Sequence, residues 1–552
     1  MNSRGRFTTV GNYTANANNL TGGYSGADLL MGYFNQIDSA VALAKGDFRN
    51  HEWAAYIDDT FKMTQRLTVN VGLRWEVAQP LLDKAGNEVN FQFKQPLPYT
   101  ANEPNAALHP TYVRTGNGDF YENIDFRFTG AVQLARDGRL GKRLIKTDYN
   151  NFAPRLGIAY SPSNQWSIRA GFGIFFSQES KNSIFDLNRG LGGRATITPD
   201  NQGTTTPTYD NFINTSQLPV KLNSPSGLTW GADSNLATTY TMSYLLNVQR
   251  SLGNHSTLEV GYTGNQSRKL AFLINGNGPV PGITPFATRA PYPEWQAIQF
   301  ITGDGVANYN ALSGKLTQRF GNGLTTLFSY TWSKALDENS AIRGTGDDFT
   351  PQDPHCRACE RGPAGFTIPH RFVTSILYTL PFGKGQRFLN HGGVVNQILG
   401  GWQLSTITAV QSGTSITTRS WDAAGQGIVP DGNRLNCLAG VSQVAANPNP
   451  DKYYDPAAFS NATAGKFGTC GRNNLIAPST WNVDFSVLKD FRISEKHRLQ
   501  FRTEMFNAPN HPAWGRPSAS WGSSNVAANT GFGRIRSTSQ LRQIQFTLKY
   551  YF

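Results

Sequence analysis

The chain has 552 residues, of which 39% are apolar and 16% charged, against about 45–50% and about 25% in soluble proteins. Its net charge is +13, but Lys and Arg are dispersed along the chain, so nucleic-acid binding is not expected. No run of about 18 uncharged apolar residues occurs, which excludes a transmembrane helix. The start, MNSRGRFTTVGNYT, lacks the apolar core of a signal peptide, and we expect none in this chain.

The predicted elements are strands in which apolar and polar residues alternate. In LTVNVGLRWE (67–76), Leu67, Val71 and Trp75 share one face while Asn70 and Arg74 share the other, because successive strand side chains point to opposite sides. The same alternation predicts about 15 strands, many of them about 9–12 residues long, which suits strands that cross a bilayer at a tilt. In chain order they are 4–12, 27–34, 51–63, 66–77, 153–161, 165–177, 239–250, 256–264, 309–320, 324–335, 371–380, 402–411, 481–490, 497–507 and 541–552.

The gaps between these strands alternate between short and long. Short turns follow residues 63, 161, 250, 320 and 490, and a medium link of sequence PFGKGQRFLNHGGVVNQILGG follows residue 380. The long segments are 78–152, 178–238, 265–308, 336–370, 412–480 and 508–540. Short periplasmic turns and long extracellular loops are typical of outer-membrane barrels. We therefore predict an all-β, transmembrane antiparallel β-barrel, integral to the outer membrane of a Gram-negative bacterium and in contact with its lipid and lipopolysaccharide.

Counting the strands back from the C-terminus gives an odd number, whereas bacterial barrels normally have an even one. We therefore expect residues 1–552 to be a single barrel domain, truncated at its N-terminus. Aromatic residues near strand ends predict the interfacial girdles of such a barrel: Trp53, Trp75, Trp166, Tyr262, Trp332, Tyr378, Trp402, Trp481, Phe506 and Tyr550.

The last strand carries an apolar face that ends in a terminal aromatic residue, formed by Ile544, Phe546, Leu548, Tyr550 and Phe552. Such an end resembles the signal read by the outer-membrane assembly machinery. On the polar face of the strands, charged residues are expected to line the lumen. These are Arg74, Glu76, Arg169, Lys315, Arg319, Arg502 and Glu504. Ligand recognition is expected in the long outer loops.

The four cysteines favour disulfides over a metal site. Cys356 and Cys359 form a lone CxxC next to His355, and Cys437 and Cys470 are not in such a motif. A zinc site would require a second pair at suitable spacing, so disulfides in exposed loops are the preferred interpretation. The natural pairing is 356–359 and 437–470, although the sequence leaves the connectivity open.

No motif of a known catalytic class is present, and neither an enzyme nor a cofactor is predicted. Asp347, Asp348 and Asp353 gather in one loop without EF-hand spacing, so a solvated acidic loop is preferred to a calcium site. His370 precedes a strand on the loop side and is interpreted as a polar rim residue.

The sequence resembles TonB-dependent receptors of the Oar-like type over nearly its whole length. The resemblance is carried by WAAYIDDTFKMTQRLTVNVGLRWE (53–76), NFAPRLGIAYSP (151–162), YNALSGKLTQRFGNGLTTLFSYTWSKALDE (309–338), LQFRTEMFNAPNHPAWG (499–515) and the final strand. It implies a 22-stranded barrel with an N-terminal plug that imports a bulky ligand, energised by the TonB complex. This chain has no recognisable plug or TonB box, so contact with TonB is expected only through a plug outside it.

Two other interpretations remain open from the sequence. One is a plugless barrel that acts passively or presents its loops as an adhesin does. The other is a soluble extracellular all-β binding module.

Overall fold

The computed structural model describes most of the chain. The described residues are 6–9, 11, 13–15, 23–33, 36–39, 46–97, 102–124, 128, 132–177, 187, 195–197, 229–321, 323–341, 351–390, 392–426, 433–494, 496–521 and 531–552. No helix in these ranges is long and apolar enough to span a membrane.

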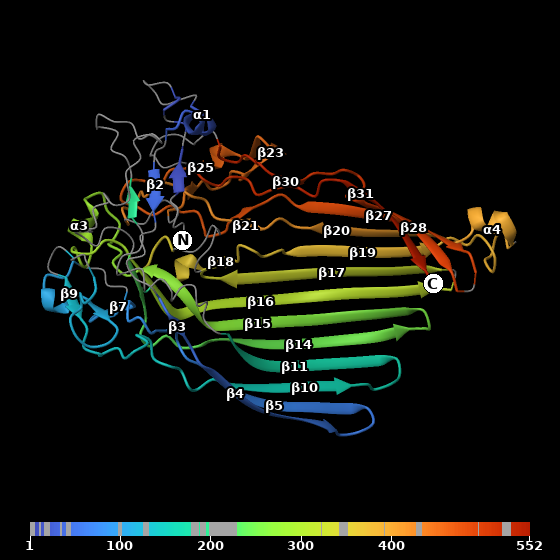
Figure 1. Ribbon diagram of the computed structural model, residues 1–552, viewed down its shortest axis with the longest axis horizontal. Helices are drawn as coiled ribbons and strands as arrows, with labels where there is room; N and C mark the ends of the chain where they lie inside the picture. Colours follow the sequence, from blue (N-terminus) through green and yellow to red (C-terminus); the bar gives the residue numbers. More distant parts are fainter. Residues whose placement is uncertain are drawn as a thin grey trace.

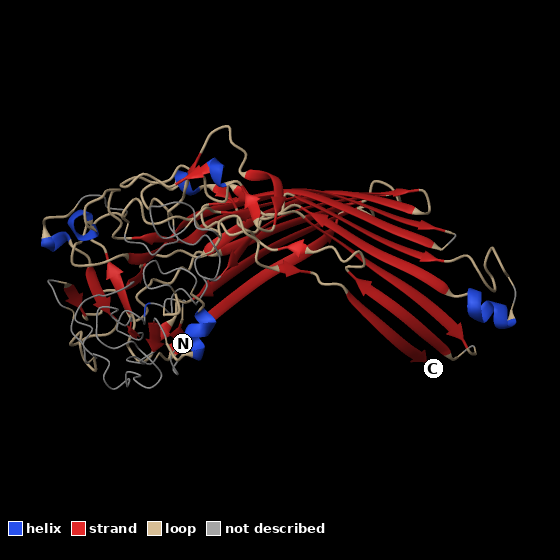
Figure 2. Cartoon of the chain, turned by 90° about the horizontal axis from the view of Figure 1, so that it is seen from above, coloured by secondary structure: helices blue, strands red, loops and turns tan. Residues whose placement is uncertain are grey.

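One large curved sheet dominates the fold (Figures 1 and 2). In the described part of the chain, thirteen strands follow one another along it, each antiparallel to the next. They are β4 (Glu52–Lys62), β5 (Leu67–Ala78), β10 (Phe152–Tyr160), β11 (Trp166–Ser177), β14 (Thr239–Leu252), β15 (Ser256–Asn275), β16 (Ile298–Phe320), β17 (Leu324–Asp337), β19 (His370–Thr379), β20 (Trp402–Gln411), β27 (Thr480–Arg492), β28 (Arg498–Phe506) and β31 (Gln543–Tyr551). Two short strands, β13 (Thr229–Ala232) and β18 (Gly362–Pro363), pair with β16 and β17. The sheet ends at β4 and β31, which do not pair with each other.

The predicted antiparallel transmembrane sheet is confirmed, but in the described residues neither of the two N-terminal strands predicted at 4–12 and 27–34 belongs to it. The strand predicted at 27–34 was wrong, because α1 (Ser25–Leu30) occupies residues 27–30. The buried Asp28 carboxylate in its first turn accepts hydrogen bonds from Thr14 N and Oγ1, at 2.9 and 2.8 Å. Leu29, Leu30 and Met31 are consecutive apolar residues without alternation, so they never matched a two-faced strand well.

The predicted strand 4–12 is shorter than expected and lies outside the large sheet. Its described strand, β1 (Arg6–Thr8), pairs with β2 (Gln36–Ser39), which pairs in turn with β12 (Ala195–Ile197). Two other strands are longer than predicted, because β15 and β16 run on to Asn275 and back to Ile298. The far ends of these extensions, residues 271–275 and 298–301, are buried, so they lack the alternation of the membrane-crossing part.

The register gives the large sheet one apolar face. Val71 lies opposite Leu156, Leu156 opposite Phe172, and Phe172 opposite Tyr244. Directly opposed residues share a face, so the apolar sets of separate strands join into a continuous surface. Many of these side chains are exposed, as expected for a face that contacts lipid. The predicted girdle aromatics share this face except Phe506, which lies opposite Gln543 on the polar face.

The long segments fold into a layer at one end of the sheet, which we call the loop layer (Figure 2). Its small sheets pair β3 (Phe48–Arg49) with β6 (Leu82–Asp83), β7 (Val89–Gln92) with β8 (Thr111–Arg114) and β9 (Gln133–Ala135), β21 (Ser415–Ile416) with β26 (Leu475–Ile476), β22 (Asn436–Cys437) with β25 (Phe459–Ser460), β23 (Val444–Asn449) with β24 (Lys452–Tyr454), and β29 (Ala513–Trp514) with β30 (Thr538–Ser539). Its short helices include α3 (Phe286–Arg289), η1 (Ala106–Leu108), η4 (Ala358–Glu360) and η5 (Pro456–Ala458).

The opposite end of the sheet carries the short turns. It also carries α4 (Gly393–Leu399), which lies beyond the ends of β19 and β20 (Figure 1). The separation of long loops from short turns agrees with the layout predicted from the gap lengths.

Candidate functional site

The seven charged residues predicted for the lumen all lie on the polar face of the sheet. Arg74 Nε donates to Glu76 Oε2 at 2.7 Å within β5. Arg502 and Glu504 on β28 form a looser pair, with 4.0 Å between the nearest nitrogen and oxygen. Arg169 on β11 lies opposite Asn247 of β14. In the described structure β4 and β31 are the two edges of the sheet, so the sheet does not close around a lumen. That these seven residues line a lumen therefore stays a prediction.

Lys315 and Arg319 belong to a polar hollow at the turn end of β14, β15 and β16. The hollow has a volume of about 400 Å³, and its lining includes Glu259 and His255. Lys315 lies directly opposite Glu259 in the register of β15 and β16. The hollow is small and open, and it groups charges of both signs on the polar face.

The predicted set missed other polar-face residues. Arg155 lies on this face opposite Gly72 and Gly173, with its guanidinium 5.0 Å from the Phe175 ring centroid. Asp484 accepts hydrogen bonds from Asn482 Nδ2 at 2.8 Å and from the backbone N of Asn507 at 2.9 Å. Both positions follow from the strand alternation and could have been included on that basis.

An aromatic cluster forms one core of the loop layer. Phe91, Tyr112 and Trp295 are buried together, with the Phe91 ring centroid 4.4 Å from Tyr112 and 4.8 Å from Trp295. Burial raises the pKa of the Tyr112 phenol. Such aromatic pairs contribute about 0.5–1.5 kcal/mol each beyond their area. The segments 78–152 and 265–308, expected as loops, are therefore held in a defined arrangement.

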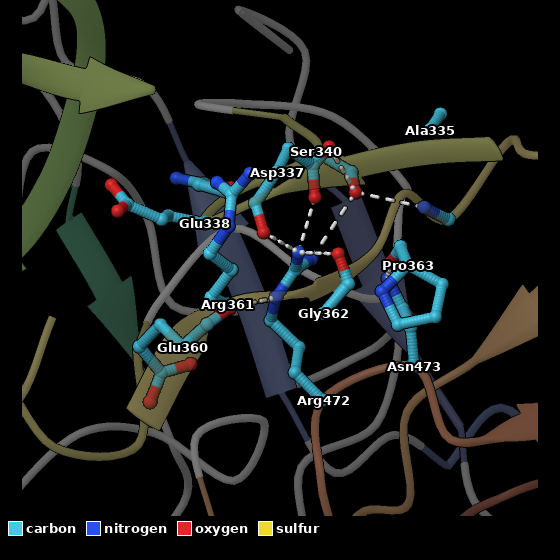
Figure 3. A network of polar contacts seen from close by, with 12 residues as sticks. Ala335, Asp337, Glu338, Ser340, Glu360, Arg361, Gly362, Pro363, Arg472 and Asn473 are labelled. Carbon is cyan, nitrogen blue, oxygen red and sulfur yellow. Dashed lines mark hydrogen bonds and ion pairs between the residues drawn. The ribbon is translucent and has the colours of Figure 1, made fainter. Parts of the chain in front are cut away.

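Two buried ion pairs bind the end of β17 and the loop following it to the loop preceding β27. Figure 3 shows the contacts of Arg472, which forms one of them. Arg472 pairs with Asp337, and their side chains are 1% and 5% exposed. Arg472 Nε also donates to Glu360 O at 2.6 Å and its Nη1 to Ser340 Oγ at 3.2 Å. Arg434 pairs in the same way with Glu360. Because buried charges are costly unless they are paired, these contacts specify one arrangement of the two loops.

The cysteines lie in the same two loops. Sγ of Cys356 is bonded to Sγ of Cys359, and Sγ of Cys437 to Sγ of Cys470. His355 Nε2 instead contacts the backbone oxygen of Gly278 at 3.0 Å. Nowhere in the described ranges do three His, Cys, Asp or Glu side chains gather as a metal would require. Formation of the two disulfides in the cell stays a prediction.

The remaining singled-out residues are placed as follows. Asp347 and Asp348 lie outside the described residues, and Asp353 Oδ1 accepts a hydrogen bond from the backbone N of His355 at 2.8 Å. His370 lies at the loop end of β19, with its Nδ1 2.8 Å from Tyr330 Oη. In β31 the predicted apolar residues are exposed, and the strand joins the sheet by pairing with β28. These residues are Ile544, Phe546, Leu548 and Tyr550.

Glu88, just before β7, is a buried carboxyl group that the sequence did not single out. Burial and the negative charge of Asp83 raise its pKa to about 8, although a backbone hydrogen bond at Asp83 and the charge of Arg143 oppose the rise. Asp83 itself accepts hydrogen bonds from the backbone N of Asp47 and of Asn87, both at 2.8 Å. Because this carboxyl group is mostly protonated at physiological pH, we expect the stability of the loop layer to depend on pH.

An apolar outer face, a polar inner face and a folded layer of long loops define an integral outer-membrane barrel protein. The chain belongs to the outer membrane beta barrel domain family, whose model matches residues 1–545. The protein lies in the outer membrane. No curated protein matches the chain.

Several solved structures are similar to the chain. The ferric citrate transporter FecA is 11% identical over 94% of this chain and 46% of its own, with a TM-score of 0.40. The FrpB iron transporter of Neisseria meningitidis is 9% identical, over 91% and 45%, at 0.41. The siderophore receptor PirA of Acinetobacter baumannii is 10% identical, over 92% and 47%, at 0.40. The chain therefore spans about half the length of these proteins.

Proposed function

We propose that this chain forms most of the barrel wall of an Oar-like, TonB-dependent receptor, which binds a bulky ligand and imports it across the outer membrane. The proposal rests on the ordered set of matching segments, above all 53–76 and 309–338. The observation that carries it furthest is the loop layer, whose aromatic cluster and buried ion pairs hold several loops together at one end of the sheet. A braced set of outer loops suits recognition of a large ligand, because binding then orders few further residues.

In the proposed receptor each part has a separate task. The loop layer recognises the ligand, and the charged residues of the polar face contact the plug or the passing solute. Energy comes from TonB through a plug that lies outside this chain.

The proposal is tested on the natural full-length gene product in a strain that excludes vancomycin. We expect photo-cross-linking to join the protein to TonB, and we expect the cells to exclude vancomycin until the plug is deleted. Removing the plug should then open the polar interior and sensitise the cells. A protein that never cross-links to TonB and admits vancomycin in its natural form would be a passive barrel. A protein that never cross-links to TonB and excludes vancomycin even after the plug is deleted would favour the adhesin-like alternative.

A further inference from the structure

The medium link between β19 and β20 contains the helix α4, whose exposed side is apolar. Val394 and Ile398 are 74% and 60% exposed, and Val395 and Leu399 are also exposed. At about 100° per residue these four positions fill an arc of about 140°, which is an amphipathic pattern. Phe388 and Leu389, which precede the helix in the same link, are exposed as well.

Polar contacts fix α4 to the end of the sheet. Asn396 Oδ1 accepts a hydrogen bond from the backbone N of Lys384 at 2.7 Å, and Gln397 Nε2 donates to Arg492 O at 2.8 Å. Gly383 adopts a φ of +107°, and an added Cβ there would lie 2.7 Å from the Cα of Gly400. The polar side of the helix is therefore used for anchoring, and its apolar side is left to face outward.

The helix is joined to the apolar face of the sheet, not to the polar face. Trp402 Nε1 donates to the backbone oxygen of Ile398 at 2.9 Å, and Lys489 Nζ donates to the oxygen of Gly400. Four neighbouring strands place one residue each in the same row across the sheet. The row consists of Trp402 on β20, Lys489 on β27, Phe501 on β28 and Leu548 on β31. These residues belong to the row that faces lipid, so the exposed side of α4 continues the lipid-contacting surface at the turn end.

We propose that α4 and the residues before it lie in the periplasmic leaflet of the outer membrane and bind its anionic phospholipids. Amphipathic helices bury their apolar side at the boundary of headgroups and acyl chains, and nearby basic residues strengthen binding to anionic lipid. The link from 381 to 401 contains Lys384 and Arg387 and no Asp or Glu. The Trp402 indole lies at the turn end of the apolar face, as expected of an aromatic residue at a membrane interface.

The test uses the full-length protein in vesicles of phosphatidylethanolamine and phosphatidylglycerol. The four cysteines of this chain form two disulfides in the structure, so Ile398→Cys adds one free thiol to it for an environment-sensitive fluorophore, and the parent protein without this substitution gives the background labelling. The matched control is Asn164→Cys, in the short exposed turn between β10 and β11 at the same end of the sheet. We expect lipid carrying a nitroxide near its headgroup to quench the label at 398 several-fold more than at 164, and aqueous iodide to show the reverse order.

Equal quenching by lipid at both positions, with full access of iodide to 398, would overturn the proposal. Protection of 398 from both quenchers would also overturn it, because a second copy or another protein would then cover α4. Val394→Cys repeats the measurement if Ile398→Cys does not reach the folded, heat-modifiable form. The outcome does not depend on ligand import, so it is independent of the proposed function.

Discussion

At the scale of single residues, the buried carboxyl group of Glu88 should make the loop layer sensitive to pH. Its pKa rises from 4.5 to about 8 on folding, so the folded state holds a proton that the unfolded chain has lost. Its contribution to stability is complete below about pH 4.5 and is lost as the pH rises through about 8. We expect protection of the amides of residues 88–91 from hydrogen exchange to fall over this interval, after correction for intrinsic rates. Glu88→Gln should flatten this dependence, and an unchanged slope in the variant would assign it to another group.

The buried pair of Arg472 and Asp337 should be the strongest single polar contribution to the loop layer. Asp337→Ala leaves a guanidinium that is 1% exposed without its partner, and we expect a loss of about 3–5 kcal/mol in the unfolding of this layer. The exposed pair of Arg139 and Asp137 serves as the control, because solvent screens this pair and Asp137→Ala should leave stability nearly unchanged. Denaturant titration of the two variants measures the difference. Equal small losses would show that Asp337 is not needed.

At the scale of strands, the two faces of the sheet should respond differently to the same charge. Leu246 is exposed on the apolar face between Ala170 and Tyr262, whereas Ser243 lies on the polar face between Gly173 and Asn265. Leu246→Arg should cost about 2–4 kcal/mol if it lies near the bilayer midplane, while Ser243→Arg should be tolerated. Refolding stability of the full-length protein in lipid vesicles measures both. Similar values for the two variants would contradict a lipid-facing surface.

The last strand should be needed for assembly. Phe552 is 92% exposed and continues the apolar side of β31. Its deletion should lower the amount of heat-modifiable protein in the outer membrane while synthesis continues, because the terminal aromatic resembles an assembly signal. Lys549→Gln, on the polar side of the same strand, is the control. Normal assembly without Phe552 would refute this role for the strand.

Strands could be predicted from the sequence wherever one side contacts lipid and the other contacts water. Residues 67–76 are the clearest example, because two solvents impose a strict period of two. The prediction failed at 27–34, where residues 27–30 belong to a helix and Leu29, Leu30 and Met31 are apolar without alternation. It also stopped short in β15, whose last residues, 271–275, are all buried and therefore do not alternate between two solvents.

At the scale of the whole molecule, the loop layer could not be predicted from local patterns. Arg472 and Asp337 are separated by 135 positions, and Asn90 donates to the backbone oxygen of Ala232 across 142 positions. Nothing in the neighbourhood of either residue specifies its partner, because such contacts depend on how the strands bring the loops together. Only the charges of the polar face could be assigned beforehand, since strand alternation alone determines the side on which they lie.

The odd number of consecutive strands has a consequence for the complete barrel. Thirteen antiparallel strands leave β4 and β31 running in the same direction, so direct closure between them would require a parallel pair. In the 22-stranded architecture that the family resemblance implies, nine strands besides the thirteen described would complete the wall, instead of the about seven expected beside fifteen predicted strands.

The most direct test of the account is a structure of the full-length protein in lipid nanodiscs, determined by electron cryo-microscopy. The account predicts that β4 and β31 each pair with an additional antiparallel strand, that the barrel closes with an even strand number, and that a plug contacts the polar face near Arg74 and Arg169. A sheet in which β4 and β31 pair directly, or in which both remain free edges in lipid, would contradict the claim that this chain is the wall of a larger receptor barrel.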